Sequence, residues 1–484
     1  MNSKQFALPT LTLAIAVPAF AQDKIVTPPP APAPSAGLLN DFLRDKSAAF
    51  TDWDIGGQVR GRFEGKSGSA VAGVPGAVDF SKATPDNNYF LLREKFHIGW
   101  KPLSWVNVFA EGRDSSSWDD RRRPEPDEDS LDLHQAYLAL GDAREFPLSA
   151  KIGRQELGYG DERLVGTFEW NNIGRVFDAA KLRFENDTFW VDTFAGRVVL
   201  ANDGEFNVAN DYDWFSGVYA STKTLIPKQE TQLYFLARNT GDKSPFATTG
   251  SPQAGGPPER DIYTAGLRFK SSPGQFGGWD YDAELAGQFG NFYDTTLARN
   301  LQHEAFAGHV AGGYSWKDAW SAPRLGLEYN FASGDSDSSD GTHGTFENLF
   351  PTNHKYYGFM DFASWQNLHN VRLTTSAKPA KKLTLTVDFH LFWLADTDDS
   401  FYAVSGARRG GLAATPGTGY GINPSYDSFA GSEIDLIATY AIKPYAAAQV
   451  GYGHFFRGDY VKQSLSVTGS KDADWFYAQL AFNF

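Results

Sequence analysis

Beyond its first fifty residues, the chain is a succession of about eighteen runs of roughly ten residues in which apolar and polar side chains alternate. In the last run, residues 474–484, Phe476 and Leu480 have one parity and Tyr477 and Gln479 the other. Strict alternation is the period of a β-strand with one apolar and one polar face. So many short amphipathic strands predict an all-β fold, and a final aromatic residue directly after such a strand is typical of the closing strand of a membrane barrel.

The connections between the runs alternate in length, which indicates how the strands are arranged. The long, polar connections cover residues 65–88, 115–130, 159–176, 201–211, 241–260, 291–302, 333–365, 395–429 and 457–472. The short ones cover residues 101–103, 141–147, 185–187, 223–229, 271–278, 317–321, 379–381 and 443–444. A transmembrane barrel has long extracellular loops and short periplasmic turns, whereas a propeller would show a blade-length repeat, which is absent here. We predict a transmembrane antiparallel β-barrel of about 18 strands.

Composition excludes several other classes of protein. After the first twenty residues no stretch of 18 apolar residues occurs, which excludes a helical membrane protein. Cys is absent, so disulfides, thiolate nucleophiles and Cys-based zinc sites are excluded. The formal net charge of −14 argues against nucleic acid as a partner.

The amino-terminal residues predict export from the cytoplasm. Residues 1–21 combine Lys4, an apolar stretch over residues 6–17 and the small residues Ala19 and Ala21, as a signal peptide does. Residues 22–50 read as a Pro- and Ala-rich periplasmic leader, and residues 51–484 as the barrel. The expected location is the outer membrane of a Gram-negative bacterium, in contact with lipid and lipopolysaccharide.

Parity within each run predicts which charged side chains face the lumen. An Arg facing lipid near the middle of the bilayer costs about 2–4 kcal/mol, so the inward assignment is favoured. The inward cations are Arg60, Arg62, Arg93, Lys95, Arg113, Lys181 and Arg183. The inward acids are Asp280, Asp282, Glu284, Glu328, Asp388, Glu433 and Asp435. Glu94 breaks the pattern and would face lipid unless its strand carries a bulge.

The two sets of charges come from different parts of the predicted barrel. The cations belong to its first third and the acids mostly to strands eleven to sixteen, and those two arcs face each other in a closed barrel. We expect a basic wall opposite an acidic wall, with a transverse field that orients polar solutes. The alternative is that these side chains fill a wet lumen and pair with their neighbours.

Three stretches of the sequence resemble the alginate export family of outer-membrane proteins: residues 153–164, 170–178 and 350–358, the last reading FPTNHKYYG. The resemblance extends over residues 53–484. It implies an eighteen-stranded barrel whose basic lumen passes an anionic polysaccharide outward. Carried over by motif, it implies lumen positions for Arg154 and Glu156, and positions at the outer mouth, or folded into it, for Asp161, Arg163, Arg175 and Asp178.

The resemblance and the charges together predict the function. A guanidinium binds carboxylate in a fork, which suits passage of a polyuronate over several weak sites. The inward charges are nearly balanced in sign, however, whereas a dedicated polyanion exporter should be positive inside. We predict a channel for passive transport, in the outward direction, of a polar, anionic polysaccharide or oligosaccharide. A general or carbohydrate-uptake porin is the alternative, and periplasmic secretion partners are candidates.

Enzymatic and metal sites have weaker support. Asp388 and His390 share one strand face and are the only tidy acid and imidazole pair for a barrel hydrolase, but two polar side chains that fill the lumen are the favoured explanation. No Gly-x-Ser-x-Gly motif is present. Asp335, Asp337 and Asp340 resemble a calcium loop in composition, but Phe346 occupies the position of its last acid. We predict no enzyme, no cofactor and no metal.

Overall fold

The computed structural model describes residues 38–71, 74, 77–241, 259–294, 298–409 and 415–484. The predicted signal peptide, residues 1–21, and the first part of the predicted leader, residues 22–37, lie outside the described residues. The end of the leader forms two helices, α1 (Leu38–Lys46) and the 3-10 helix η1 (Ala48–Phe50). Asn40 of α1 donates to Asp54 Oδ1 and accepts from the N–H of Ile55, both at 2.7 Å, which fixes α1 against the first strand.

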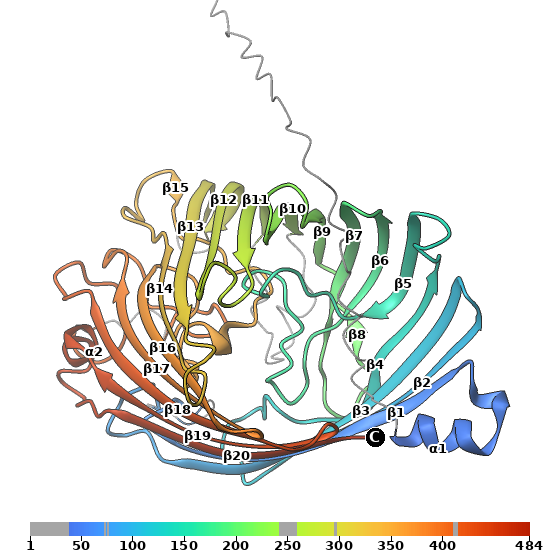
Figure 1. Cartoon of the computed structure of the whole chain (residues 1–484). Coiled ribbons are helices and arrows are strands. Elements are labelled where there is room, and N and C mark those ends of the chain that lie inside the picture. Colours follow the sequence, from blue (N-terminus) through green and yellow to red (C-terminus); the bar gives the residue numbers. More distant parts are fainter. Residues whose placement is uncertain (1–37, 72–73, 75–76, 242–258, 295–297, 410–414) are drawn as a thin grey trace, which may run out of the picture. The chain divides into compact units, whose positions relative to one another are not determined.

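Twenty strands are assigned within the described residues, and eighteen of them form a closed antiparallel barrel (Figure 1). The wall strands are β1 (Trp53–Ser67), β2 (Asn87–Leu103), β3 (Val106–Trp118), β4 (Asp129–Leu140), β5 (Leu148–Gln155), β6 (Phe177–Glu185), β7 (Phe189–Leu200), β9 (Asp213–Thr222), β10 (Gln229–Thr240), β11 (Arg260–Ser271), β12 (Trp279–Asp294), β13 (Arg299–Ser315), β14 (Arg324–Ala332), β16 (Leu368–Ala380), β17 (Leu383–Leu394), β18 (Phe429–Lys443), β19 (Ala446–Arg457) and β20 (Ala473–Asn483). The two-residue strands β8 (Val208–Ala209) and β15 (Thr342–His343) belong to connecting loops. The predicted fold and strand number are therefore confirmed.

The barrel closes where the sequence pattern predicts. β20 pairs antiparallel with β1, from Gln58 opposite Asn483 to Ser67 opposite Asp474, and the amide of Gln58 donates to Asn483 at 2.9 Å. Closure removes the free strand edges that would otherwise leave backbone groups unpaired in lipid. None of the helices in the described part of the chain is long and apolar enough to span a membrane.

Burial alternates along the wall strands as the parity argument requires. In β2, Phe96 and Ile98 are exposed on the outer face, whereas Arg93, Lys95 and His97 are buried on the inner face. Aromatic pairs mark the two rims of the outer face: Trp53 stacks on Trp100 near the short turns, and Phe90 packs on Trp118 near the long loops. This apolar outer band with aromatic borders is the surface of a membrane barrel.

Glu94 lies on the outer face without a bulge to turn it inward. The β1–β2 ladder is regular at this position, with Glu94 opposite Val59. In the β2–β3 ladder Glu94 is opposite Asp114, and the only irregularity lies between Trp100 and Leu103. Two carboxylates are therefore neighbours on the outer surface.

Two long connections leave the wall and fold into the lumen. Loop A (residues 156–176) joins β5 to β6, and loop B (residues 333–367) joins β14 to β16 and contains β15 and the 3-10 helix η3 (Asn353–Lys355). Their apolar side chains, including Leu157, Val165, Phe350 and Trp365, are buried in the main hydrophobic cluster. Figure 1 shows coil segments inside the ring of strands. A further helix, α2 (Asp459–Ser464), lies in the connection between β19 and β20.

Candidate functional site

Five inward cations on β1, β2 and β3, which we call the basic wall, bind loop A. They are Arg60, Arg62, Arg93, Lys95 and Arg113, and none is more than 9% exposed. Arg60 donates to the backbone carbonyls of Glu169 at 2.9 Å and Asn171 at 3.0 Å. Arg62 donates to the carbonyl of Trp170 at 2.7 Å, and its guanidinium lies 4.0 Å from the centre of the Trp170 ring. Arg113 donates to the carbonyl of Ile173 at 2.6 Å.

The carboxylate of Glu169 completes the contact between loop A and the basic wall. It accepts from Arg93, and its Oε2 lies 3.1 Å from the ammonium of Lys95. Burial acts to raise the pKa of Glu169, but the charges of Arg93, Lys95 and Arg60 outweigh it and lower the pKa to about 2. Glu169 is therefore ionised at neutral pH and bridges two wall cations.

The inward acids of the later strands, which we call the acidic wall, also bind partners. They are Asp280, Asp282, Glu284, Glu328, Asp388, Glu433 and Asp435; Asp282 is partly buried and the other six are buried. Glu328 accepts from Arg163 of loop A at 2.8 Å, and Asp388 accepts from Arg372 of β16 at 2.5 Å. Asp161 of loop A lies 2.7 Å from Arg268 and also pairs with Lys270. Loop A therefore contacts the later strands with both a base, Arg163, and an acid, Asp161.

Two further acids of this wall, Glu433 and Asp435, hold loop B by its backbone. Glu433 Oε1 accepts from the N–H of Met360 at 2.9 Å, and Asp435 Oδ2 accepts from the N–H of Phe359 at 3.4 Å. Neither carboxylate has an ion pair with a Lys, Arg or His within 4 Å among the described residues. Backbone N–H groups of loop B therefore donate to both carboxyl groups.

Loops A and B are joined to each other in the middle of the lumen, and we call them together the plug. Phe350 exchanges backbone hydrogen bonds with loop A: its carbonyl accepts from Gly166 at 2.8 Å and its N–H donates to Leu164 at 2.9 Å. Arg175 donates to the carbonyls of Phe350 at 2.6 Å and Pro351 at 2.9 Å, and burial lowers its pKa to about 10. The ring of Trp170 stacks on His354 at 4.0 Å. The plug thus runs from the basic wall to the acidic wall.

Both groups of charged side chains face inward, but loops A and B lie between the two walls. Each wall cation described above meets a carbonyl or carboxylate of loop A, and several wall acids meet a donor from loop A or B. These contacts join the walls to loops far away in the sequence, whereas the alternative that we weighed has the charged side chains pair with their neighbours. A transverse field across open water stays a prediction.

The motif residue Arg154 does not face the lumen, which corrects its predicted position; its partner Asp178, predicted at the outer mouth, lies beside it. Arg154 shares the outward parity of Ile152, which is 53% exposed on the outer face. Its guanidinium pairs with Asp178 at 2.8 Å and lies 5.4 Å from the ring of Phe206. Asp178 is likewise opposite Arg197, whose guanidinium covers the outward Trp214. The lumen assignment of Arg154 was wrong because Asp178 pairs with it on the outer face. The connection that follows β7 covers this ion pair and keeps it out of the hydrocarbon.

The other motif residues lie on the inner side. Glu156 lies 3.2 Å from His134 and 3.9 Å from Lys95, while Asp161, Arg163 and Arg175 are part of the plug as described. Lys181 and Arg183 face inward on β6, and Asp192 of β7 holds them at 3.5 Å and 2.6 Å.

Sequence reasoning missed two groups that contact these charges. Glu169 lies in a loop, where no periodicity indicates its direction. Lys151 faces inward on β5 opposite Lys181, and its ammonium lies 3.6 Å from the centre of the Tyr137 ring. The alternation of Leu148, Lys151 and Ile152 could have identified it.

The two members of the candidate hydrolase pair are held by other partners. The Asp388 carboxylate is held by Arg372, and the His390 ring is buried, stacked on Phe392 and 3.3 Å from Asn370. No group of three or more His, Cys, Asp or Glu side chains in the described ranges is arranged to hold a metal ion. In the acidic loop, Asp335 instead accepts from the N–H of Asp337 at 3.3 Å.

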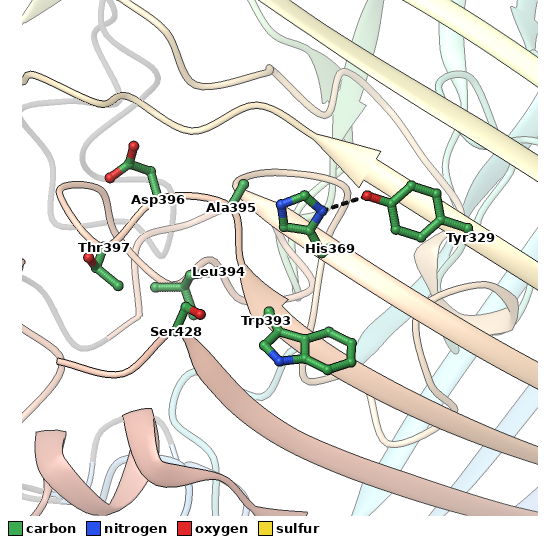
Figure 2. Close-up of a pocket in the computed structure, with 8 residues that line it drawn as sticks. All are labelled: Tyr329, His369, Trp393, Leu394, Ala395, Asp396, Thr397 and Ser428. Carbon is green, nitrogen blue, oxygen red and sulfur yellow. Dashed lines mark hydrogen bonds between the residues drawn. The ribbon is translucent and has the colours of Figure 1, made fainter.

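A separate pocket of about 460 Å³ lies outside the lumen, where β14 and β17 end and β16 begins (Figure 2). It is lined by the outward residues Tyr329, His369 and Trp393 and by the loop residue Asp396. Figure 2 shows the hydrogen bond between Tyr329 and His369, which is 2.7 Å long. Because these rings belong to the outer aromatic border, the pocket takes no part in a route through the barrel.

Comparison with known proteins agrees with the fold and the motifs. A family model described as alginate export matches residues 52–472. Among solved structures, the chain is similar to OccD3 (OpdP) of Pseudomonas aeruginosa, with 12% identity, a TM-score of 0.54 and coverage of 89% of this chain and 91% of the other. It is also similar to OccAB1 of Acinetobacter baumannii, with 10% identity, a TM-score of 0.55 and coverage of 90% and 96%. No curated protein matches the sequence significantly.

Proposed function

Because the chain belongs to the alginate export family, we propose that it is an outer-membrane channel that passes an anionic polysaccharide or oligosaccharide passively, in the outward direction. A porin-like barrel provides the conduit, and its charged lumen provides the affinity. The long loops then lie at the cell surface and the short turns in the periplasm.

The contact between loop A and the basic wall carries this proposal. One carboxylate and four backbone carbonyls of loop A contact the five wall cations. Arg62 and Arg113 also pair with acids of the wall strands, Glu64 and Asp129. The carboxylates and hydroxyls of a uronic acid chain offer the same types of acceptor oxygen. An acidic oligosaccharide can therefore replace loop A on the wall without leaving a buried cation unpaired, which would be costly.

Such an exchange allows passage without an energy source. Each cation has an acceptor before, during and after the exchange, so the chain moves along several weak sites rather than into one tight site. Inward cations below the plug, Lys151, Lys181 and Arg183, extend the basic surface toward the short turns. We infer that a polyanion from the periplasm meets these three residues before it reaches the basic wall.

A porin for small polar solutes is the second candidate, and the plug itself favours it. Loops A and B fill the centre of the lumen and are joined by hydrogen bonds, which suits a narrow path better than a wide conduit. The two candidates differ in what should pass. A small-solute porin should admit neutral mono- and disaccharides as readily as acidic ones.

Flux into liposomes that contain the purified barrel distinguishes the candidates. We expect oligouronates of three to five residues to pass faster than neutral glucans of the same length. Equal rates for the two, with a steep fall beyond disaccharides, would favour the small-solute porin. A barrel that passes neither would exclude both.

A further inference from the structure

The ladder between β4 and β5 is the shortest in the described wall. These strands pair over five positions, from Ala136 opposite Arg154 to Leu140 opposite Ala150. Every other neighbouring pair of wall strands is joined over eight to sixteen positions. The cause is that β5 ends at Gln155 and the chain turns into the lumen, where Leu157 is 1% exposed. Residues 129–135 of β4 therefore have no strand partner on that side, and we call this edge the seam.

Side chains close the seam in place of a backbone ladder. The connection that follows β7 supplies them from residues 201–207, which we call loop C. Asp203 accepts from the N–H and the hydroxyl of Ser130 at 2.9 and 2.6 Å. The N–H of Asn207 donates to Asp132 at 2.5 Å. From β5, Arg154 donates to the carbonyl of Leu133 at 3.1 Å. Side chains can release such contacts without breaking a strand ladder.

The seam lies at the level of the apolar band. Leu131 is 77% exposed and lies beside Gly112 of β3, where an added Cβ would be 3.7 Å from its Cδ1. Trp118, the outward aromatic residue at the rim of β3, lies six residues nearer to the long loops than Gly112. Phe206 of loop C is 64% exposed at the other side of the seam. Exposed apolar side chains thus border the seam on the membrane side of the rim.

Polar groups accompany these apolar side chains on the outer face. Arg154 and Asp178 form an ion pair there, and Glu94 and Asp114 are outward neighbours on the strands before β4. Elsewhere on this band outward positions carry side chains such as Leu233, Leu285 and Phe306, each at least 60% exposed. An apolar border beside ionised groups is suited to a molecule with one apolar and one polar end.

We propose that the seam is a lateral portal that binds a single-chain amphiphile from the outer leaflet. The alkyl chain lies along Leu131 and Phe206, and the polar head enters between β4 and β5 against Arg154 when loop C releases the edge of β4. This site needs neither the plug nor a polyanion, so it goes beyond the transport proposed above.

Hydrogen exchange of the unmodified protein in lipid nanodiscs tests the portal. We expect peptides from residues 129–135 to exchange at least about tenfold faster than peptides from β10, which has long ladders on both sides. Dodecyl maltoside below its micellar concentration should slow exchange in residues 129–135, and maltose should not. Equal exchange in the two segments, or a seam unaffected by dodecyl maltoside, would overturn the proposal.

A cross-link across the seam provides the second measurement. Because the chain has no Cys, Ser130→Cys with Asp203→Cys introduces a single thiol pair, which a short bifunctional reagent can join. Cross-linking should slow exchange in residues 129–135 and abolish the effect of dodecyl maltoside. The matched control is Asn239→Cys with Asp261→Cys, an outward hydrogen-bonded pair within a full ladder; cross-linking it should leave the seam unchanged. If both cross-links act alike, the portal is refuted.

Discussion

Replacing Glu169 by Gln tests whether charge holds the plug against the basic wall. The carboxylate bridges Arg93 and Lys95, and these two cations have the largest effects in lowering its pKa. Gln keeps the size of the side chain and one carbonyl acceptor but removes the negative charge. We expect the plug to leave the wall more often, and the mean conductance to rise.

The size of the effect follows from the pKa and the exposure of Glu169. A fall from 4.5 to about 2 corresponds to about 3 kcal/mol at 1.36 kcal/mol per unit. The side chain is 48% exposed, so solvent screening reduces this contribution to about 1–2 kcal/mol. That free energy shifts the ratio of undocked to docked plug by about 5- to 30-fold.

Single-channel recording in planar bilayers measures this ratio as the fraction of time in the open state. The matched control is Glu185→Gln, which removes a carboxylate near the short turns that lies 3.5 Å from Arg183 and has no contact with the plug. An open fraction in Glu169→Gln equal to that of the wild type, or a rise of the same size in Glu185→Gln, would refute electrostatic docking of loop A.

Four other predictions follow from the same contacts. The docking contribution of Glu169 is fully present above about pH 4.5 and is lost as pH falls toward 2, so the open fraction of the wild type should rise between pH 5 and pH 3, while Glu169→Gln should change little. A disulfide between cysteines at Val165 and Phe350, which form a backbone bridge, should lower conductance, and a reductant should restore it. Burial, with nearby acids, raises the pKa of Asp335 to about 6, so the stabilisation from its protonated form is lost as pH rises through 6. At pH 8, Asp335→Asn should therefore increase the free energy of unfolding by up to about 3 kcal/mol, seen as a higher melting temperature. At pH 3 the substitution should leave the melting temperature unchanged. Lys151→Gln should weaken binding of an oligouronate about 3- to 10-fold, measured as block of the current from the short-turn side.

The fold could be predicted because its determinants are periodic. Alternation assigned Arg93 and Lys95 to the lumen and Phe96 to lipid, and the lengths of the connections gave the order of loops and turns. Closure between residues 474–484 and the first strand followed from the even number of runs and is confirmed. These signals repeat in every strand, so an error in one run does not change the count.

The plug could not be predicted, since it depends on contacts between distant loops. Residues 159–176 and 333–365 both read as polar connections, and no local pattern indicates that Gly166 will pair with Phe350. The prediction for Arg154 was wrong for a related reason. Parity placed its side chain on the outer face, but the cost of a charge in lipid led us to assign it to the lumen. Its partner Asp178 and the Phe206 ring that lies near it come from other parts of the chain, so the sequence pattern did not reveal them.

Displacement of loop A by an acidic oligosaccharide is the central claim, and hydrogen exchange measures it most directly. With a uronate tetramer in solution, peptides from residues 165–176 should exchange faster than in the free protein, while a neutral glucan tetramer should have no effect. Unchanged exchange in loop A at uronate concentrations that block the current, or equal changes with both tetramers, would contradict the account.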